Sequence, residues 1–215
     1  MQQPKQALGQ RWSRAILRGL GWRVQANLPD AKKYVLIAAP HTSNWDFLYM
    51  LLFAGALNIH PHWAAKDSMF RWPVTGLWKQ LGGIPVNRRS RNNFVNQMVT
   101  AFQQSEEMIL IIAPEGTRAK AGYWKSGFYY IALGAGVPIV MGFLDFGRKV
   151  GGLGPAIMPT GDIRTDFVAI REFYADKTGM YAHEQGEIRL REDMDVPLAQ
   201  TAVSGDNGCK AGAAE

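Results

Sequence analysis

The sequence contains a single cysteine, Cys209, so it cannot form an internal disulfide or a cysteine-rich zinc site. It also has no long hydrophobic run: a charge, a proline or a glycine interrupts every apolar stretch before the roughly 20 residues that a membrane-spanning helix needs. The N-terminus lacks the apolar segment of a secretory signal. These absences predict a cytoplasmic protein of a reducing compartment that does not cross a bilayer.

Acidic residues are scarce in the first 125 positions, which hold 6 of them against 16 lysines and arginines. Residues 126–215 hold 12 acidic and 8 basic residues, and the whole chain has a net charge of +6. A strongly basic half suits anionic partners such as a membrane surface or a phosphorylated small molecule. No nucleic-acid-binding motif and no cluster of basic and stacking residues accompanies this charge, so nucleic acid is not expected as a partner.

The chain is long and apolar enough for one globular domain, with 47% hydrophobic residues among 215 positions. From residue 33 onward, short apolar runs alternate with helical patterns, which predicts a single α/β domain over residues 31–193. We expect strands at 34–39, 63–65, 83–87, 108–113 and 137–146, and helices at 45–57, 92–104, 128–136 and 165–175, with another after Pro73. A glycine-rich turn is expected at 147–154 and a flexible tail at 194–215.

The N-terminal 30 residues contain a basic amphipathic helix. Trp12, Ile16 and Leu20 recur every four positions, while Arg11 and Arg18 point in other directions around a helix of 3.6 residues per turn. Two interpretations remain open. The helix can lie in the headgroup region of an anionic membrane, or it can pack its apolar stripe against the core of the domain.

A histidine and an aspartate follow the first expected strand in the segment PHTSNWDF. His41 lies in the turn and Asp46 at the start of the next helix, so the aspartate can fold back onto the imidazole ring. A carboxylate on one ring nitrogen holds the tautomer in which the other nitrogen accepts a proton, as in a Ser-His-Asp triad. The ordinary alternatives are a structural histidine and a helix-start carboxylate. Ser43 and Asn44 are expected to cap this helix, and Trp45 is expected in the core.

The segment APEGTR follows another strongly apolar strand. Arg118 offers a planar fork for a phosphate, the Thr117 hydroxyl can donate as well, and Gly116 lets the backbone approach closely. Glu115 would repel a phosphate unless its carboxylate is paired with an arginine or bonded to the hydroxyl of the acceptor. Because the carboxyl ends of strands in α/β sheets collect ligands, we expect both turns at one edge of the sheet.

PHTSNWD and APEGTR together resemble the H-x4-D and EGTR blocks of the glycerolipid and lysophospholipid acyltransferase family. GIPVNR (83–88) is similar to the family's Gly-to-Arg block, and GVPIV (136–140) to its last block. All four occur in order between about Leu36 and Val140. The family often has Asn and Gln around the histidine, where this chain has Pro40 and Thr42.

This resemblance implies a mixed central sheet flanked by helices and an O-acyltransferase activity in phospholipid biosynthesis or remodelling. The acyl group would move from acyl-CoA or acyl-carrier protein to the hydroxyl of a lysophospholipid such as 1-acylglycerol-3-phosphate. The enzyme would need no metal or other cofactor and would sit on the anionic inner face of the cytoplasmic membrane. The implied residues are His41 and Asp46 for catalysis, Lys66 and Gly116 for the oxyanion, and Arg88, Glu115, Thr117 and Arg118 for the acceptor's phosphate.

Three other functions compete with this one. The acceptor can be a different lyso-lipid, such as an aminolipid. A metal hydrolase would use His41, Asp46, His60 and His62 as ligands, although the last two lie in a proline-containing loop. A protein that only binds anionic lipid would explain the basic residues, but not the spacing of His41 and Asp46.

Overall fold

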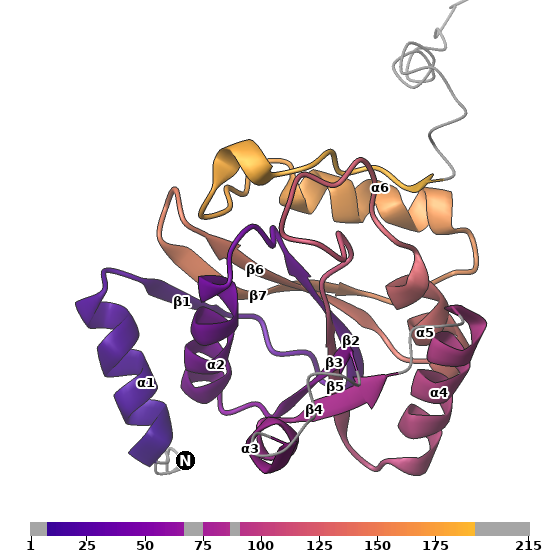
Figure 1. Ribbon diagram of the computed structural model, residues 1–215, viewed down its shortest axis with the longest axis horizontal. Helices are drawn as coiled ribbons and strands as arrows, with labels where there is room; N and C mark the ends of the chain where they lie inside the picture. Colours follow the sequence, from indigo (N-terminus) through magenta and orange to yellow (C-terminus); the bar gives the residue numbers. More distant parts are fainter. Residues whose placement is uncertain (1–7, 67–74, 87–90, 192–215) are drawn as a thin grey trace, which may run out of the picture.

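The computed structural model describes residues 8–66, 75–86 and 91–191, which form a seven-stranded sheet between two layers of helices (Figure 1). The strand order is β1-β7-β6-β2-β5-β3-β4. The strands from β6 to β4 are parallel to one another, β7 is antiparallel to β6, and β1 is parallel to β7. The predicted α/β fold with a mixed central sheet is therefore confirmed. The strands are β1 (Arg23–Ala26), β2 (Lys33–Ala39), β3 (Pro61–Lys66), β4 (Gly83–Val86), β5 (Met108–Ile112), β6 (Ile139–Asp145) and β7 (Val150–Ile157).

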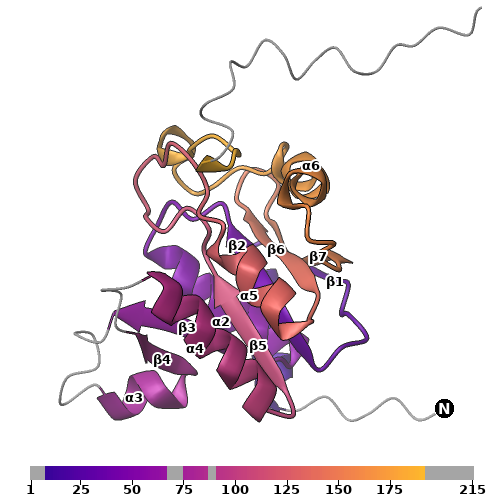
Figure 2. The same ribbon diagram turned by 90° about the vertical axis from the view of Figure 1, so that its right-hand side faces the viewer.

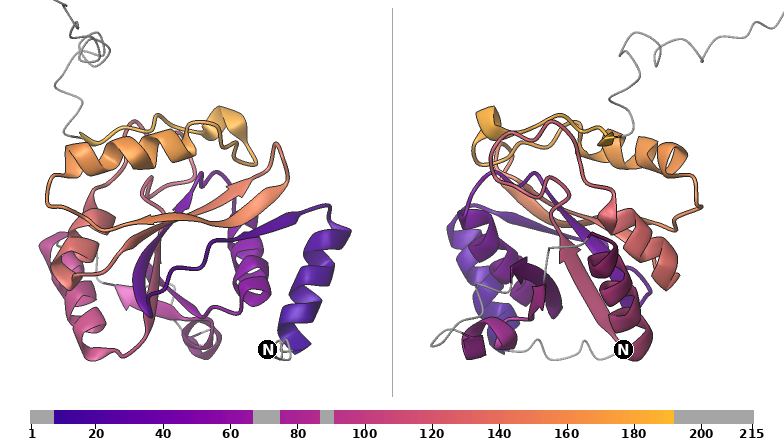
Figure 3. Two further views of the ribbon diagram at one scale, coloured as in Figure 1. Left: turned by 180° about the vertical axis from the view of Figure 1, so that it is seen from behind. Right: turned by 45° about the vertical axis from the view of Figure 1, so that its right-hand side comes forward.

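Helices cover both faces of the sheet, as the side and rear views show (Figures 2 and 3). The first three helices of the chain lie on one face, and the last three lie on the other. The helices are α1 (Leu8–Gly19), α2 (Trp45–Leu57), α3 (Thr75–Gln80), α4 (Arg91–Gln104), α5 (Gly127–Ala135) and α6 (Ile163–Tyr174), with a short 3-10 helix at Ala182–Glu184. Among the described residues, none of the helices has both the length and the apolar character that a membrane crossing requires.

Strand β2 lies at the centre of the sheet and divides its side chains between two cores. Val35 and Ile37 face the larger core, which is completed by α4, α5 and α6. Leu36 faces the smaller core beneath α2. This alternation explains why β2 reads as a continuous apolar run: both faces of a parallel strand are covered, so both need apolar side chains.

The turn predicted for the glycine-rich segment 147–154 is present only at 147–149, and the prediction was wrong for 150–154, which belong to strand β7. Its glycines are needed because neighbouring groups approach the backbone closely. A Cβ on Gly151 would lie 2.7 Å from the ring of Phe53, and one on Gly154 would meet the ring of Phe173. Gly152, at φ +135°, packs against the backbone of Gln25 in β1. These contacts allow β7 to form between β6 and β1.

Helix α1 packs on α2 rather than on the sheet. Gln10 Nε2 and Arg14 Nε both donate to the carbonyl oxygen of Ala56, at 3.2 and 2.9 Å. Leu17 is fully buried in a small core beside α2. Trp12 is 64% exposed, and Leu8, Ile16 and Leu20, on the same stripe, are also exposed. The stripe found in the sequence therefore does not pack against the core of the domain.

Candidate active site

The two motif loops meet at the carboxyl edge of the sheet. Strands β2 and β5 are adjacent and parallel, so the loops that follow them leave the sheet on the same side. The backbone N–H of His41 donates to Glu115 Oε2 at 2.8 Å. This contact joins PHTSNWD to APEGTR and confirms that both turns lie at one edge.

His41 and Asp46 form a hydrogen-bonded pair. The distance from His41 Nδ1 to Asp46 Oδ2 is 3.0 Å, and the same oxygen accepts the backbone N–H groups of Thr42 and Ser43, each at 3.0 Å. Asp46 is buried, whereas the His41 side chain remains 28% exposed. The turn is wound around the carboxylate, which fixes the imidazole and leaves Nε2 as the nitrogen that can take a proton from a substrate.

Glu115 is a buried carboxylate that faces the His41 turn. Burial raises its pKa to about 7, the hydrogen bond from His41 N–H opposes this rise, and the nearby charge of Asp46 adds to it. Among the described residues its hydrogen-bond partner is the backbone N–H of His41, and not an arginine that would offset the repulsion of a phosphate. The sequence indicated that Glu115 needs a partner but could not identify that partner, because 74 positions separate the two residues.

Arg118 also connects the two loops. Its Nη1 donates to Oδ1 of Asn44. Asn44 is the N-cap residue of α2, as predicted, but its side chain makes no capping hydrogen bond. Ser43 Oγ accepts the N–H of Trp45 at 3.1 Å and takes part of that role. The prediction that Trp45 lies in the core was wrong, because its side chain is 55% exposed.

The remaining predicted residues are described to different extents. Gly116 has φ +65°, a left-handed conformation that favours glycine, and the exposed Thr117 Oγ1 accepts the N–H of Ala119 at 3.2 Å. Strand β3 ends at Lys66 on the same edge of the sheet, although its side chain is not described. Arg88 and the tail 194–215 lie outside the described residues.

A segment that the sequence did not indicate, residues 176–190, crosses both loops; we call it the C-terminal strap. The backbone N–H of Tyr181, in the strap, donates to Oγ1 of Thr42 at 3.1 Å, and Thr42 is the residue after His41. Further along, Glu184 Oε2 accepts the N–H of Lys120 at 3.1 Å, and Arg189 Nε donates to the carbonyl of Gly122 at 2.9 Å. The strap thus holds the loop after β2 and the loop after β5 in one arrangement.

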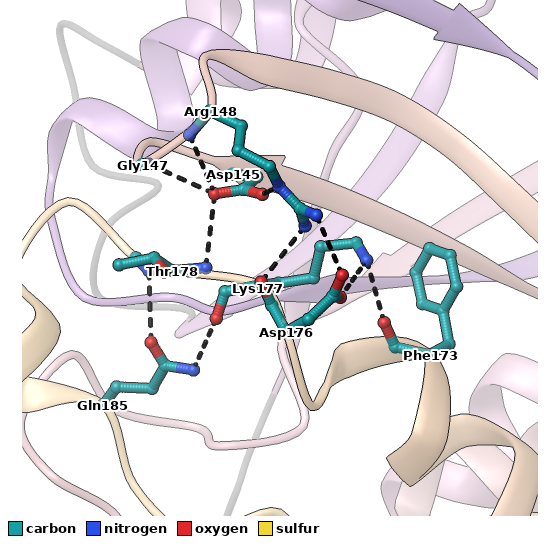
Figure 4. A network of polar contacts seen from close by, with 9 residues as sticks. Asp145, Gly147, Arg148, Phe173, Asp176, Lys177, Thr178 and Gln185 are labelled. Carbon is teal, nitrogen blue, oxygen red and sulfur yellow. Dashed lines mark hydrogen bonds and ion pairs between the residues drawn. The ribbon is translucent and has the colours of Figure 1, made fainter.

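The first residues of the strap are anchored to the end of β6 (Figure 4). Asp145 is 1% exposed and accepts the N–H groups of Gly147, Arg148 and Thr178. The Arg148 guanidinium bonds to Asp145 and, at 2.9 Å, to Asp176. Hydrogen bonds from Arg148 and then Lys177 lower the pKa of Asp176 to about 2. The carboxylate of Asp176 therefore stays charged at neutral pH and keeps its ion pair with Arg148.

An apolar cavity of about 210 Å³ lies between α2 and the sheet, with His41 and Asp46 in its wall. The rest of the lining is mainly hydrophobic and includes Leu36, Ala38, Met50, Phe53, Leu57, Ile111 and Leu153. The sequence could not indicate this cavity, because its walls come from five strands and one helix. It gives the histidine an apolar surface on which a hydrocarbon chain can lie.

The ligand set of the metal-hydrolase alternative is not assembled. Within residues 8–66, 75–86 and 91–191, no three His, Cys, Asp or Glu side chains are grouped so that they could hold a metal ion. His60 and His62 therefore do not join His41 and Asp46 in such a group.

Comparison with known proteins identifies the family. A stretch of 105 residues, 46% of this chain, is 30% identical to 1-acyl-sn-glycerol-3-phosphate acyltransferase epsilon of Mus musculus and covers 29% of that protein. The crystal structure of the 1-acyl-sn-glycerophosphate (LPA) acyltransferase PlsC from Thermotoga maritima aligns with a TM-score of 0.49 at 16% identity, over 80% of each chain. Residues 22–141, more than half of the chain, match the family described as Acyltransferase. The chain therefore belongs to this acyltransferase family.

Proposed function

We propose that the protein transfers a fatty acyl group from a thioester to the hydroxyl of a lysophospholipid such as 1-acylglycerol-3-phosphate. The observation that carries this proposal is the His41–Asp46 pair, bonded at 3.0 Å in the wall of an apolar cavity. Family membership and the names of the similar proteins support the same reaction.

The reaction follows from the chemistry of this pair. His41 Nε2 takes the proton of the acceptor hydroxyl while the hydroxyl oxygen attacks the thioester carbonyl carbon, and Asp46 stabilises the imidazolium that forms. The tetrahedral intermediate then collapses to the ester, and the departing thiolate receives the proton from His41. No nucleophilic serine is needed, because the acceptor supplies the hydroxyl.

The other predicted residues act around this centre. Lys66 and the amide of Gly116 would stabilise the oxyanion, for which one well-placed donor lowers the barrier by about 3 kcal/mol. Arg88, Thr117 and Arg118 would bind the phosphate of the acceptor. We assign Glu115 to the same site, where its bond to His41 N–H also holds the catalytic turn. The acyl chain of the donor, carried by coenzyme A or acyl-carrier protein, would occupy the apolar cavity.

The test is acyl transfer by purified protein from thioesters of varied chain length to lysophosphatidic acid, other lysophospholipids and lyso-aminolipids. His41→Ala and Asp46→Ala should each lower turnover by about two to four orders of magnitude without unfolding the protein. His60→Ala is the matched control, because that histidine is exposed and precedes β3, at the edge of the sheet opposite the motif loops. Near-normal transfer by His41→Ala would refute the mechanism.

We also propose that α1 binds the anionic inner face of the cytoplasmic membrane, where the lipid acceptor resides. Trp12 and its neighbours on the stripe are exposed, and α1 contains three arginines and no acidic residue. Such a helix lays apolar side chains into the headgroup region while its arginines meet anionic lipid.

Sedimentation with phosphatidylglycerol vesicles tests this membrane contact. Trp12→Ser with Ile16→Ser should weaken binding at least about tenfold, whereas Val168→Ser, an exposed position on α6, should not. Equal binding by both variants would refute the role of α1. Vesicle binding without acyl transfer by the wild-type protein would instead favour a protein that only binds lipid.

A further inference from the structure

Lys125 lies against the backbone of the EGTR loop, although the sequence did not single it out. A Cβ on Gly116 would meet its ammonium group and would lie 2.9 Å from Cε and 3.1 Å from Cδ. The side chain therefore runs across the face of Gly116 that a larger residue would occupy. The φ of +65° is what favours glycine at this position, and the lysine lies in the space that the absent Cβ leaves.

The backbone around Lys125 holds the lysine at this place. Its N–H donates to the carbonyl of Pro114 at 2.8 Å, and the N–H of Gly116 donates to the carbonyl of Ala113 at 3.1 Å. The loop from Pro114 to Lys125 is closed on itself, so the start of the lysine side chain is fixed beside Gly116. The backbone thus places the lysine beside Gly116, and its flexible side chain can carry the ammonium to an anion at this loop.

The charge of Lys125 is not used within the described part of the chain. Its ammonium has no hydrogen-bond or ion-pair partner among residues 8–66, 75–86 and 91–191, and Arg118 bonds there only to the neutral Asn44. Arg148, in contrast, bonds to two carboxylates. The carboxylate next to Gly116, that of Glu115, faces His41 instead. Two uncompensated cations therefore flank Gly116 and Thr117.

We propose that Lys125 and Arg118 together bind the phosphate of the acceptor, with Lys125 as a further specificity-determining residue of this site. This inference rests on the proposed acyl transfer and adds a residue to it. A phosphate between the two cations would receive a point charge from the lysine and a planar fork from the arginine. The side chain of Thr117, exposed on the same loop, can donate a third hydrogen bond.

Steady-state kinetics with Lys125→Gln tests the proposal. Removing one charge-assisted hydrogen bond to phosphate should raise KM for 1-acylglycerol-3-phosphate by about 10- to 100-fold, with kcat and the KM of the thioester nearly unchanged. The preference for 1-acylglycerol-3-phosphate over uncharged 1-acylglycerol should fall by the same factor. Lys125→Arg should restore most of the affinity. Lys120→Gln, an exposed lysine of the same loop, is the control and should have little effect.

Other outcomes would overturn the proposal. A rise only in the KM of the thioester would assign Lys125 to the phosphates of the donor, and a fall only in kcat would assign it to the oxyanion. Calorimetric titration with sn-glycerol 3-phosphate separates this failure from failure of the proposed function. If the wild-type protein transfers no acyl group but binds this probe and Lys125→Gln does not, the anion site stands without the reaction. Equal binding by both proteins, or binding by neither, refutes the site.

Discussion

Replacing Glu115 by glutamine should stabilise the protein at alkaline pH and much less at acid pH. The carboxylate is 6% exposed, and burial raises its pKa from 4.5 to about 7. Glutamine keeps an oxygen that can accept the N–H of His41, but it carries no charge to bury. The substitution therefore isolates the effect of the buried charge from that of the hydrogen bond.

The size and direction of the effect follow from proton linkage. Below pH 4.5, Glu115 is protonated in both the folded and the unfolded protein, so its ionisation contributes nothing. Between pH 4.5 and 7 the folded state binds the extra proton, and stability falls as the pH rises. Above pH 7 the loss is complete and amounts to roughly 3 kcal/mol, since each pKa unit corresponds to about 1.4 kcal/mol. Glu115→Gln removes this loss.

Urea unfolding followed by tryptophan fluorescence at pH 5 and pH 8 measures the difference. The stability of Glu115→Gln relative to the wild type should be about 2 to 3 kcal/mol more favourable at pH 8 than at pH 5. Glu184→Gln provides the control, because its side chain is 38% exposed and also accepts one backbone N–H. If Glu115→Gln changes the free energy of unfolding by the same amount at both pH values, Glu115 is not a buried carboxylate whose charge destabilises the fold.

Three further predictions concern the strap, strand β7 and the cavity. Thr42→Val leaves the N–H of Tyr181 without its acceptor, so it should lower the free energy of unfolding by about 1 to 3 kcal/mol and also lower turnover. Thr42→Ser keeps the acceptor and should retain both; urea unfolding and kinetic assays measure the two effects. Gly154→Ala should destabilise by about 1 to 3 kcal/mol through its clash with Phe173, whereas Gly122→Ala, which has open space around it, should be nearly neutral in thermal unfolding. Ala38→Leu should fill part of the cavity and shift kcat/KM toward thioesters about three carbons shorter, since protein interiors have little spare space.

The elements with a strong local signal were predictable from the sequence. The helix at Trp45–Leu57 has its predicted bounds, and β2 and β5 end at or near the prolines that follow them. Strand β1 was missed because its four residues, RVQA, contain no apolar run. Strand β7 was missed because glycine is the ordinary sign of a turn, and only the neighbouring rings and backbone explain its use in a strand.

The same distinction applies to the site. The contact of His41 with Asp46 was predictable, because five positions along one turn determine it. The contacts of Glu115 with His41 and of Arg118 with Asn44 each cross 74 positions, so they depend on the order of the strands. The strap has no apolar periodicity, and each of its hydrogen bonds to the loops has a backbone group, which any residue carries, on at least one side.

These long-range contacts have a consequence for how the site can vary. The carboxyl edge of the sheet determines which loops meet, but three separate links fix their geometry: Glu115 to His41, Arg118 to Asn44, and the strap to both loops. Two of these links use side chains that the proposed reaction also needs for the acceptor. Binding of a phosphate by Arg118 would therefore compete with its bond to Asn44 and loosen one link, while the other two would keep His41 and Asp46 in place. In such a site, Arg118 can exchange Asn44 for a phosphate while the hydrogen-bonded pair of His41 and Asp46 keeps its arrangement.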